Sequence, residues 1–127
     1  PATSLLDAEM LGEMASMDRE EFRELIDLYH DQVGEFVIDL HAAIFNGNAE
    51  DVNRIAHKLA GSSLACGLKA VITPLRELER QGKDGQLEGA EQLLEQIERL
   101  LKSSEDALAY HIREREEGED RSIESLR

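Results

Sequence analysis

His57 is the side chain in this sequence best suited to chemistry, because a helical pattern places it outside the core. In a helical projection of residues 49–66, apolar and small side chains gather on one side: Val52, Ile55, Ala56, Leu59, Ser63 and Cys66. His57 falls roughly 160° from the centre of that side, so we expect its imidazole to face water. A neutral imidazole, whose ordinary pKa is about 6.5, offers a nitrogen nucleophile near neutral pH.

A glycine lies one helical turn after this histidine. In the middle of a helix, Gly61 costs about 1 kcal/mol relative to alanine, which indicates that the space is needed. Residues four apart share a helix face, so Gly61 leaves one flank of the imidazole uncovered and open to an incoming reactive group. Asn53, Arg54 and Leu64 fall on the same outer face, and we interpret Leu64 as part of an apolar dock for a partner.

The sequence contains no motif that would hold a nucleotide phosphate. Neither Gly-x-x-x-x-Gly-Lys nor Gly-x-Gly-x-x-Gly occurs. No two of the four histidines are four residues apart, and one cysteine cannot build a zinc site, so we predict no metal site and no cofactor. A reactive histidine without a phosphate donor site indicates a carrier that other proteins load and unload.

Length, charge and cysteine content narrow the class of protein. The 127 residues predict one domain with one hydrophobic core. The 28 acidic residues against 14 basic ones give a formal net charge of -14, which opposes binding to nucleic acid and to anionic membrane surfaces. No apolar run approaches the roughly 20 residues that span a bilayer, so we expect no membrane insertion. A single cysteine fits a reducing, cytoplasmic location.

Apolar residues recur at helical spacing almost throughout, which predicts an all-α fold. The clearest stripe consists of Phe22, Leu25, Ile26, Tyr29, Val33, Phe36, Val37, Leu40 and Ile44. The expected helices span residues 4–16, 18–45, 49–66, 74–80 and 87–115, with residues 81–86 as a loop. Residues 67–72 form either a turn or a first helical stretch kinked at Pro74.

Four amphipathic helices with short loops bury their stripes most simply as an antiparallel up-and-down four-helix bundle. We expect the short N-terminal helix to cap one end of this bundle. The bundle domain then covers residues 1–117. Residues 118–127 are predicted to be a disordered tail, because the end of the chain is rich in charge.

The segment Ala-His-Lys-Leu-Ala-Gly-Ser-Ser at residues 56–63, followed by Gly67, resembles the histidine-containing phosphotransfer (HPt) domain of bacterial and fungal phosphorelays. The likeness covers roughly residues 5 to 110 and includes a downstream Leu78-Glu79 pair. It implies that His57 accepts a phosphoryl group from the aspartate of one receiver domain and passes it to the aspartate of another. The chain would then be a phosphocarrier without an ATP site or kinase activity of its own.

The resemblance also implies the partners. They would be receiver domains of a hybrid sensor kinase, of a response regulator, or of both, and these would bring the Mg²⁺ that transfer at an aspartate requires. The expected docking surface consists of Asn53, Ala60 and Leu64. We expect a monomer, because a complete four-helix bundle needs no second chain.

Two positions depart from the family pattern. The family usually has Lys or Arg three residues after the histidine, where this chain has Ala60. Lys58 lies about 100° round the helix, so Arg54, three residues before His57 on the same face, is the better candidate for offsetting phosphoryl charge. Glu79 stands where some members have a glutamine that hydrogen-bonds the imidazole. We hypothesise that its carboxylate accepts from Nδ1 and leaves Nε2 as the attacking nitrogen.

Two other functions stay open. The bundle could be a non-phosphorylated helical interaction module or a kinase-regulating scaffold, for which Ala60 is the supporting feature. It could also be the dimerising histidine-bearing domain of a sensor kinase. The remaining histidines, His30, His41 and His111, are interpreted as boundary residues. The residues Ser62, Ser63 and Cys66 are interpreted as small packing residues on the core side of their helix.

Overall fold

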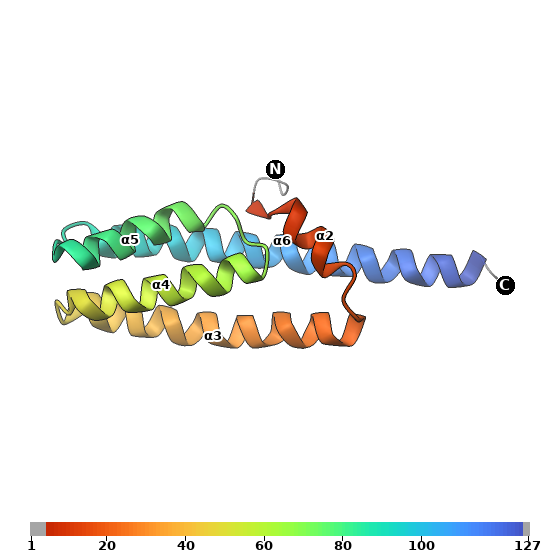
Figure 1. The fold of residues 1–127 in the computed structure, drawn as a ribbon, viewed down its shortest axis with the longest axis horizontal. Coiled ribbons are helices and arrows are strands. Elements are labelled where there is room, and N and C mark those ends of the chain that lie inside the picture. The colour runs from red at the N-terminus through yellow and green to blue at the C-terminus, as the bar shows by residue number, and fades with distance from the viewer. Residues whose placement is uncertain (1–4, 126–127) are drawn as a thin grey trace.

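The computed structural model describes residues 5–125, with side chains described through residue 118. Its helices, in chain order, are α2 (Ala8–Met14), α3 (Arg19–Phe45), α4 (Ala49–Ala65), α5 (Ile72–Asp84) and α6 (Ala90–Ser125), as Figure 1 shows. Within residues 5–125 there is no β-strand, only an isolated antiparallel bridge between Leu6 and Leu68. The prediction of an all-α fold is therefore confirmed.

The four longer helices lie side by side, and successive helices run in opposite directions (Figure 1). Helix α3 packs against α4 and α6, and α5 packs against the same two helices, so each of the four has two neighbours. Their apolar stripes meet in one core, whose fully buried side chains include Leu40, Leu59, Leu75, Leu78, Leu94 and Ile97. None of the described helices combines the length and apolar character needed to cross a bilayer.

The start of α3 and the turn between α3 and α4 are explained by residues with strong local preferences for helix ends and turns. Asp18 precedes the first turn of α3, where Glu20 and Glu21 complement the positive end of the helix dipole. The chain turns between α3 and α4 at Gly47, whose φ of 67° lies in the left-handed region that glycine adopts readily. Asn48 then caps α4, with its side-chain oxygen accepting from the backbone N–H of Asp51 at 3.1 Å.

Helix α5 differs from the prediction at both ends. It begins at Ile72, with Pro74 in its first turn, where the missing N–H removes no helical hydrogen bond. It continues to Asp84, through most of the segment predicted to be a loop. Gly82 is therefore a helical residue, and the helix ends at Gly85, a C-cap with φ of 71°. The glycine that looked like a loop residue is a packing residue.

Helix α6 begins at Ala90 and continues to Ser125, well beyond its predicted end at Arg115. Over residues 118–125, predicted from the sequence to be part of a disordered tail, the backbone is helical, and the division into domain and tail stays a prediction. The residue types favour the extension, because Glu and Arg are good helix formers. At its start, Arg115 donates to the backbone oxygens of Ala15 (2.8 Å) and Met17 (3.2 Å), and Glu116 pairs with Arg23 of α3. Residues 126–127, like Ser4 at the predicted start of the first helix, lie outside the described residues.

The N-terminal segment is tied to the loop between α4 and α5. The backbone N–H of Asp7 donates to the oxygen of Gly67 at 2.7 Å, and that of Lys69 donates to the oxygen of Leu5 at 2.8 Å. The side chain of Asp7 caps α2 by accepting from the backbone N–H of Glu9 at 3.0 Å. These bonds fix α2 near one end of α4, as Figure 1 shows.

Candidate functional site

His57 lies in the middle of α4 and faces outward. Its side chain is 67% exposed, whereas the neighbouring Ala56 and Leu59 are fully buried. This contrast follows from the helical period, because residues 56 and 59 fall on the core side while residue 57 falls away from it. The imidazole is thus held on a rigid element and remains open to a second molecule.

Glu79 reaches the imidazole from α5. Its Oε1 lies 3.1 Å from Nδ1 of His57, within hydrogen-bonding distance. A carboxylate accepts and cannot donate, so this contact selects the tautomer in which Nδ1 holds the proton and Nε2 keeps its lone pair. Partial burial raises the pKa of Glu79, but hydrogen bonds from Arg76 and His57 outweigh it, and the net pKa is lowered. The carboxylate is therefore ionised at neutral pH.

The backbone of Glu79 is anchored to α4 as well. Asn53, one turn before His57, donates from Nδ2 to the backbone oxygen of Glu79 at 2.8 Å. Close approach of the two helices makes this bond possible. A Cβ at Gly82 would lie 2.5 Å from the backbone nitrogen of Asn53 and 2.7 Å from the backbone oxygen of Ala49. Asn53 is half-buried and links the two helices through this bond, and its place on the docking surface stays a prediction.

The cation beside the imidazole is Arg76, a residue that the sequence reasoning missed. Its Nη1 lies 2.8 Å from Oε1 of Glu79 and 3.4 Å from Nδ1 of His57. Arg54, the cation preferred from the sequence, pairs with Asp51 at 3.3 Å. The only signal that could have found Arg76 is its position three residues before Glu79, a spacing that brings two side chains together on a helix.

Four further residues predicted for the site lie on α4 with His57. Gly61 is exposed, and a Cβ built on it would meet nothing within 4 Å, so its flank is open. Leu64 is exposed as expected, and Lys58 points into solvent. Ala60 is 0% exposed, so its predicted place on the docking surface is wrong. Helix α4 packs against both α3 and α5 and therefore buries a wider arc than the sequence pattern suggested.

Two of the other histidines, His30 and His41, contact acidic side chains on α6. Nδ1 of His30 lies 3.4 Å from Glu105, and the two ring nitrogens of His41 lie 2.9 Å from Glu91 and 3.2 Å from Glu98. His111 is half-buried on α6. His41 is also half-buried, so these two histidines lie at the boundary between core and solvent, whereas the side chain of His30 is 71% exposed.

The serine and cysteine predictions also fit their surroundings. Ser63 is buried, and its hydroxyl shares a 2.8 Å hydrogen bond with the hydroxyl of Tyr29, while Ser62 is half-buried. Cys66 is buried, and burial raises the pKa of its thiol to about 11. A thiol in this environment stays protonated and is a poor nucleophile.

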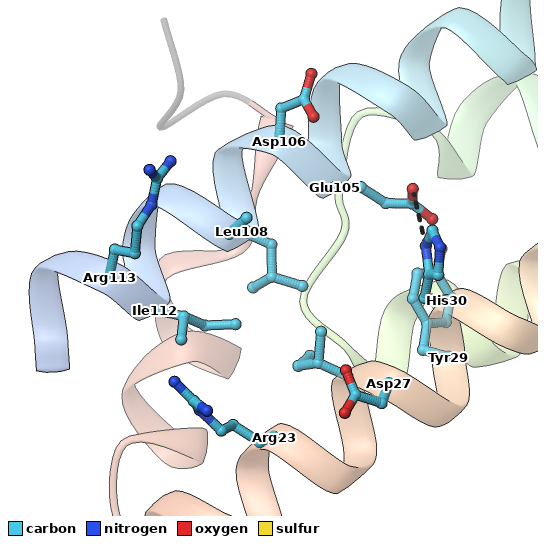
Figure 2. A pocket seen from close by; sticks show the side chains of 11 residues that line it. Arg23, Asp27, Tyr29, His30, Glu105, Asp106, Leu108, Ile112 and Arg113 are labelled. Carbon is cyan, nitrogen blue, oxygen red and sulfur yellow. Dashed lines mark ion pairs between the residues drawn. The ribbon is translucent and has the colours of Figure 1, made fainter.

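A groove with a volume of about 480 Å³ lies between α3 and α6 (Figure 2). Its apolar floor includes Leu108 and Ile112, and Arg23 and Arg113 lie at its rim. All of its lining residues belong to α3 or α6. Since His57 lies on α4 and its partners lie on α5, this groove is not part of the histidine site.

Fold and site together define a class: an all-helical protein with an exposed histidine whose ring is oriented by a carboxylate from the next helix. The chain belongs to the Hpt family, because the Hpt domain model matches residues 24–107. Members of this family are phosphocarriers in two-component systems and interact with receiver domains. A phosphotransfer role in two-component signalling therefore follows for this chain.

Solved structures agree with this assignment. The crystal structure of histidine-containing phosphotransfer protein B (HptB) from Pseudomonas aeruginosa PAO1 is similar, with a TM-score of 0.82 and 26% identity over 88% of this chain and 97% of that one. The histidine-containing phosphotransfer domain of ArcB from Escherichia coli has a TM-score of 0.67 and 15% identity, covering 89% and 97% of the two chains. The second likeness concerns the fold alone. Among curated proteins, the sequence has no significant match.

Proposed function

We propose that this protein is a phosphorelay intermediate that accepts a phosphoryl group on His57 from the aspartate of one receiver domain and passes it to the aspartate of another. The observation that supports this most strongly is the exposed imidazole with Nδ1 held 3.1 Å from Glu79. That contact leaves Nε2 as the nitrogen that meets a partner. The flank opened by Gly61 gives the phosphorylated aspartate a path to it.

The transfer balances without a proton leaving the ring. The lone pair on Nε2 attacks phosphorus, an N–P bond forms, and the P–O bond to the receiver aspartate breaks. The electron pair of that bond returns to the aspartate as a carboxylate. His57 keeps the proton on Nδ1, so the product is a cationic phosphoimidazolium, and the ionised Glu79 stabilises its charge.

Transfer to the second receiver reverses these steps. A carboxylate oxygen of that receiver attacks phosphorus, the N–P bond breaks, and its electron pair returns to Nε2. Because Glu79 holds the Nδ1 proton throughout, no general base is needed in either direction. The Mg²⁺ for both steps would come from the receivers. We expect a cytoplasmic monomer that docks each receiver transiently, because one surface serves both partners.

Incubation with a phosphorylated receiver domain and Mg²⁺ tests the proposal. We expect the protein to acquire an acid-labile, base-stable phosphoryl label, and we expect His57→Gln to lose it completely. His30→Gln is the matched control, since that imidazole also lies beside a carboxylate but on α3, and this variant should be labelled like the wild type. Equal labelling of His57→Gln would overturn the proposal and favour a non-phosphorylated interaction module.

A further inference from the structure

The carrier state assigned to His57 creates a charge problem at the site. A phosphoryl group carries about −1.5 to −2 units of charge near neutral pH, and the cationic ring of phosphohistidine offsets only one of them. It would arrive on a chain whose formal net charge is already -14, beside the ionised carboxylate of Glu79. The position three residues after His57 is Ala60, which is buried and uncharged. A cation is therefore needed from elsewhere.

The nearby cationic side chains differ in what they contact. Arg54 forms an ion pair with Asp51 on its own helix. Lys58 directly follows His57 on α4 and is exposed, so its side chain leaves the helix in a different direction from the imidazole. Arg76 lies on the facing helix, with Nη1 3.4 Å from the imidazole nitrogen Nδ1. Its side chain is 43% exposed, so it borders both the ring and the solvent from which a partner would approach.

We propose that Arg76 is the residue that binds the phosphoryl group on His57, an inference that rests on the proposed function. Without phosphate, its guanidinium bonds Oε1 of Glu79 through Nη1. A guanidinium has five N–H donors in a planar fork, so one amino group can keep Glu79 while another binds a phosphoryl oxygen. The cation that offsets phosphoryl charge thus comes from α5, although the sequence pointed to α4.

This role differs from simply holding Glu79 in place. If Arg76 only positioned the carboxylate, its removal would matter only while Glu79 is present. If it contacts the phosphoryl group, its removal slows phosphorylation even in a Glu79→Ala background. The double variant therefore separates a residue that touches the transferred group from one that acts through another side chain.

The experiment uses potassium phosphoramidate as the phosphoryl donor, so that no receiver is involved. Formation and hydrolysis of phosphohistidine are followed by ³¹P NMR and intact mass spectrometry. We expect Arg76→Gln to slow formation about tenfold and to shorten the lifetime of the phosphorylated form. We expect Arg76→Lys to recover part of the rate, because it retains the charge, and the slowing to persist in Glu79→Ala.

Arg54→Gln is the matched control and should stay within about twofold of the wild type, because Arg54 is paired with Asp51. Circular dichroism checks that each variant is folded. Equal rates for Arg76→Gln and Arg54→Gln, or loss of the Arg76 effect in Glu79→Ala, would overturn this inference alone. A wild-type protein that gains no phosphoryl group on His57 would instead overturn the proposed function.

Discussion

A carboxylate from a different helix determines which ring nitrogen of His57 keeps its lone pair. The Glu79 carboxylate accepts a hydrogen bond from Nδ1 and, in the proposed relay, its charge balances the phosphoimidazolium. A glutamine can also accept from Nδ1 through its amide oxygen, whereas alanine cannot. We therefore expect Glu79→Gln to phosphorylate within about threefold of the wild type and Glu79→Ala to be slower by roughly tenfold or more.

Rapid-mixing measurements of phosphohistidine formation with a phosphorylated receiver would compare these variants. The pair is matched in its loss of negative charge and differs in the hydrogen bond. If Glu79→Ala reacts as fast as the wild type, the carboxylate does not orient the ring, and the assignment of Nε2 as nucleophile loses its support.

Gly61 leaves open space beside the imidazole, and filling that space is a second test at a single residue. Nothing lies within 4 Å of a Cβ at this position, so a larger side chain fits the folded chain but extends into the space beside the imidazole. We expect Gly61→Leu to slow phosphorylation by a receiver domain at least about tenfold, because the docked partner is displaced. Phosphoramidate is small and should react within about threefold of the wild-type rate. Equal slowing with both donors would show that the substitution disturbs the histidine itself.

Single residues also show how far sequence reasoning reaches. The outward direction of His57 and the open flank at Gly61 follow from the period of one helix, which the sequence displays directly. Arg76 and the burial of Ala60 depend on how α4 faces its neighbours. Packing between helices is not encoded in the period of either helix, so these two features required the structure.

At the level of the helices, the close approach of α4 and α5 holds Glu79 against His57. Gly82 permits it, since a Cβ there would lie 2.5 Å from the backbone of Asn53. We expect Gly82→Ala to lower the free energy of unfolding by about 1 to 3 kcal/mol, because the helices must separate. Gly61→Ala, the same change at an open helical position, should raise it by about 0.5 to 1 kcal/mol.

Urea unfolding followed by circular dichroism gives both values. The prediction fails if Gly82→Ala is as stable as Gly61→Ala, for then the helices have room for a methyl group. We also expect Gly82→Ala to slow phosphorylation. Separation of α4 and α5 would break the bond from Asn53 to the backbone of Glu79.

A histidine also links α3 to α6. Partial burial lowers the pKa of His41, but hydrogen bonds and negative charge from Glu98 and Glu91 outweigh it, so the net pKa is raised. In the unfolded chain the pKa is about 6.5, which is lower than in the folded state. The stabilisation is therefore fully present below about pH 6.5 and is lost as pH rises through the folded-state pKa.

The measurement is the difference in unfolding free energy between the wild type and His41→Gln across pH 5.5 to 9. We expect this difference to be larger at the acidic end and to stay below about 1 kcal/mol, because the groups are partly exposed. In a background with Glu91→Gln and Glu98→Gln the pH dependence should disappear. A difference that grows with rising pH would have the opposite sign and would contradict the assignment.

Element boundaries were predicted best where residues have one strong local preference. Asp18 and the Asn46-Gly47-Asn48 turn mark the limits of α3 in the sequence, and the structure places them there. The end of α5 was wrong, because Gly82 resembles a loop residue unless the neighbouring helix is known. The end of α6 was wrong as well, because the Glu- and Arg-rich sequence that indicated disorder also consists of good helix formers.

At the level of the whole molecule, the packing of the four longer helices places the residues of the site together. Apolar periodicity and short loops were enough to predict an all-α fold, because four amphipathic helices have few ways to bury their stripes together. The bundle fixes α4 and α5 side by side, and that contact sets the distance between His57 and Glu79. The function proposed for the chain depends on this contact rather than on any enclosed pocket.

The most direct test of the account is to map the phosphoryl group after transfer from a receiver to the wild-type protein. Tandem mass spectrometry identifies the residue, and ³¹P NMR distinguishes the two ring nitrogens. With all four histidines present, we predict a single phosphoryl group on Nε2 of His57. A phosphoryl group on Nδ1 of His57, or on any other histidine, would contradict the account.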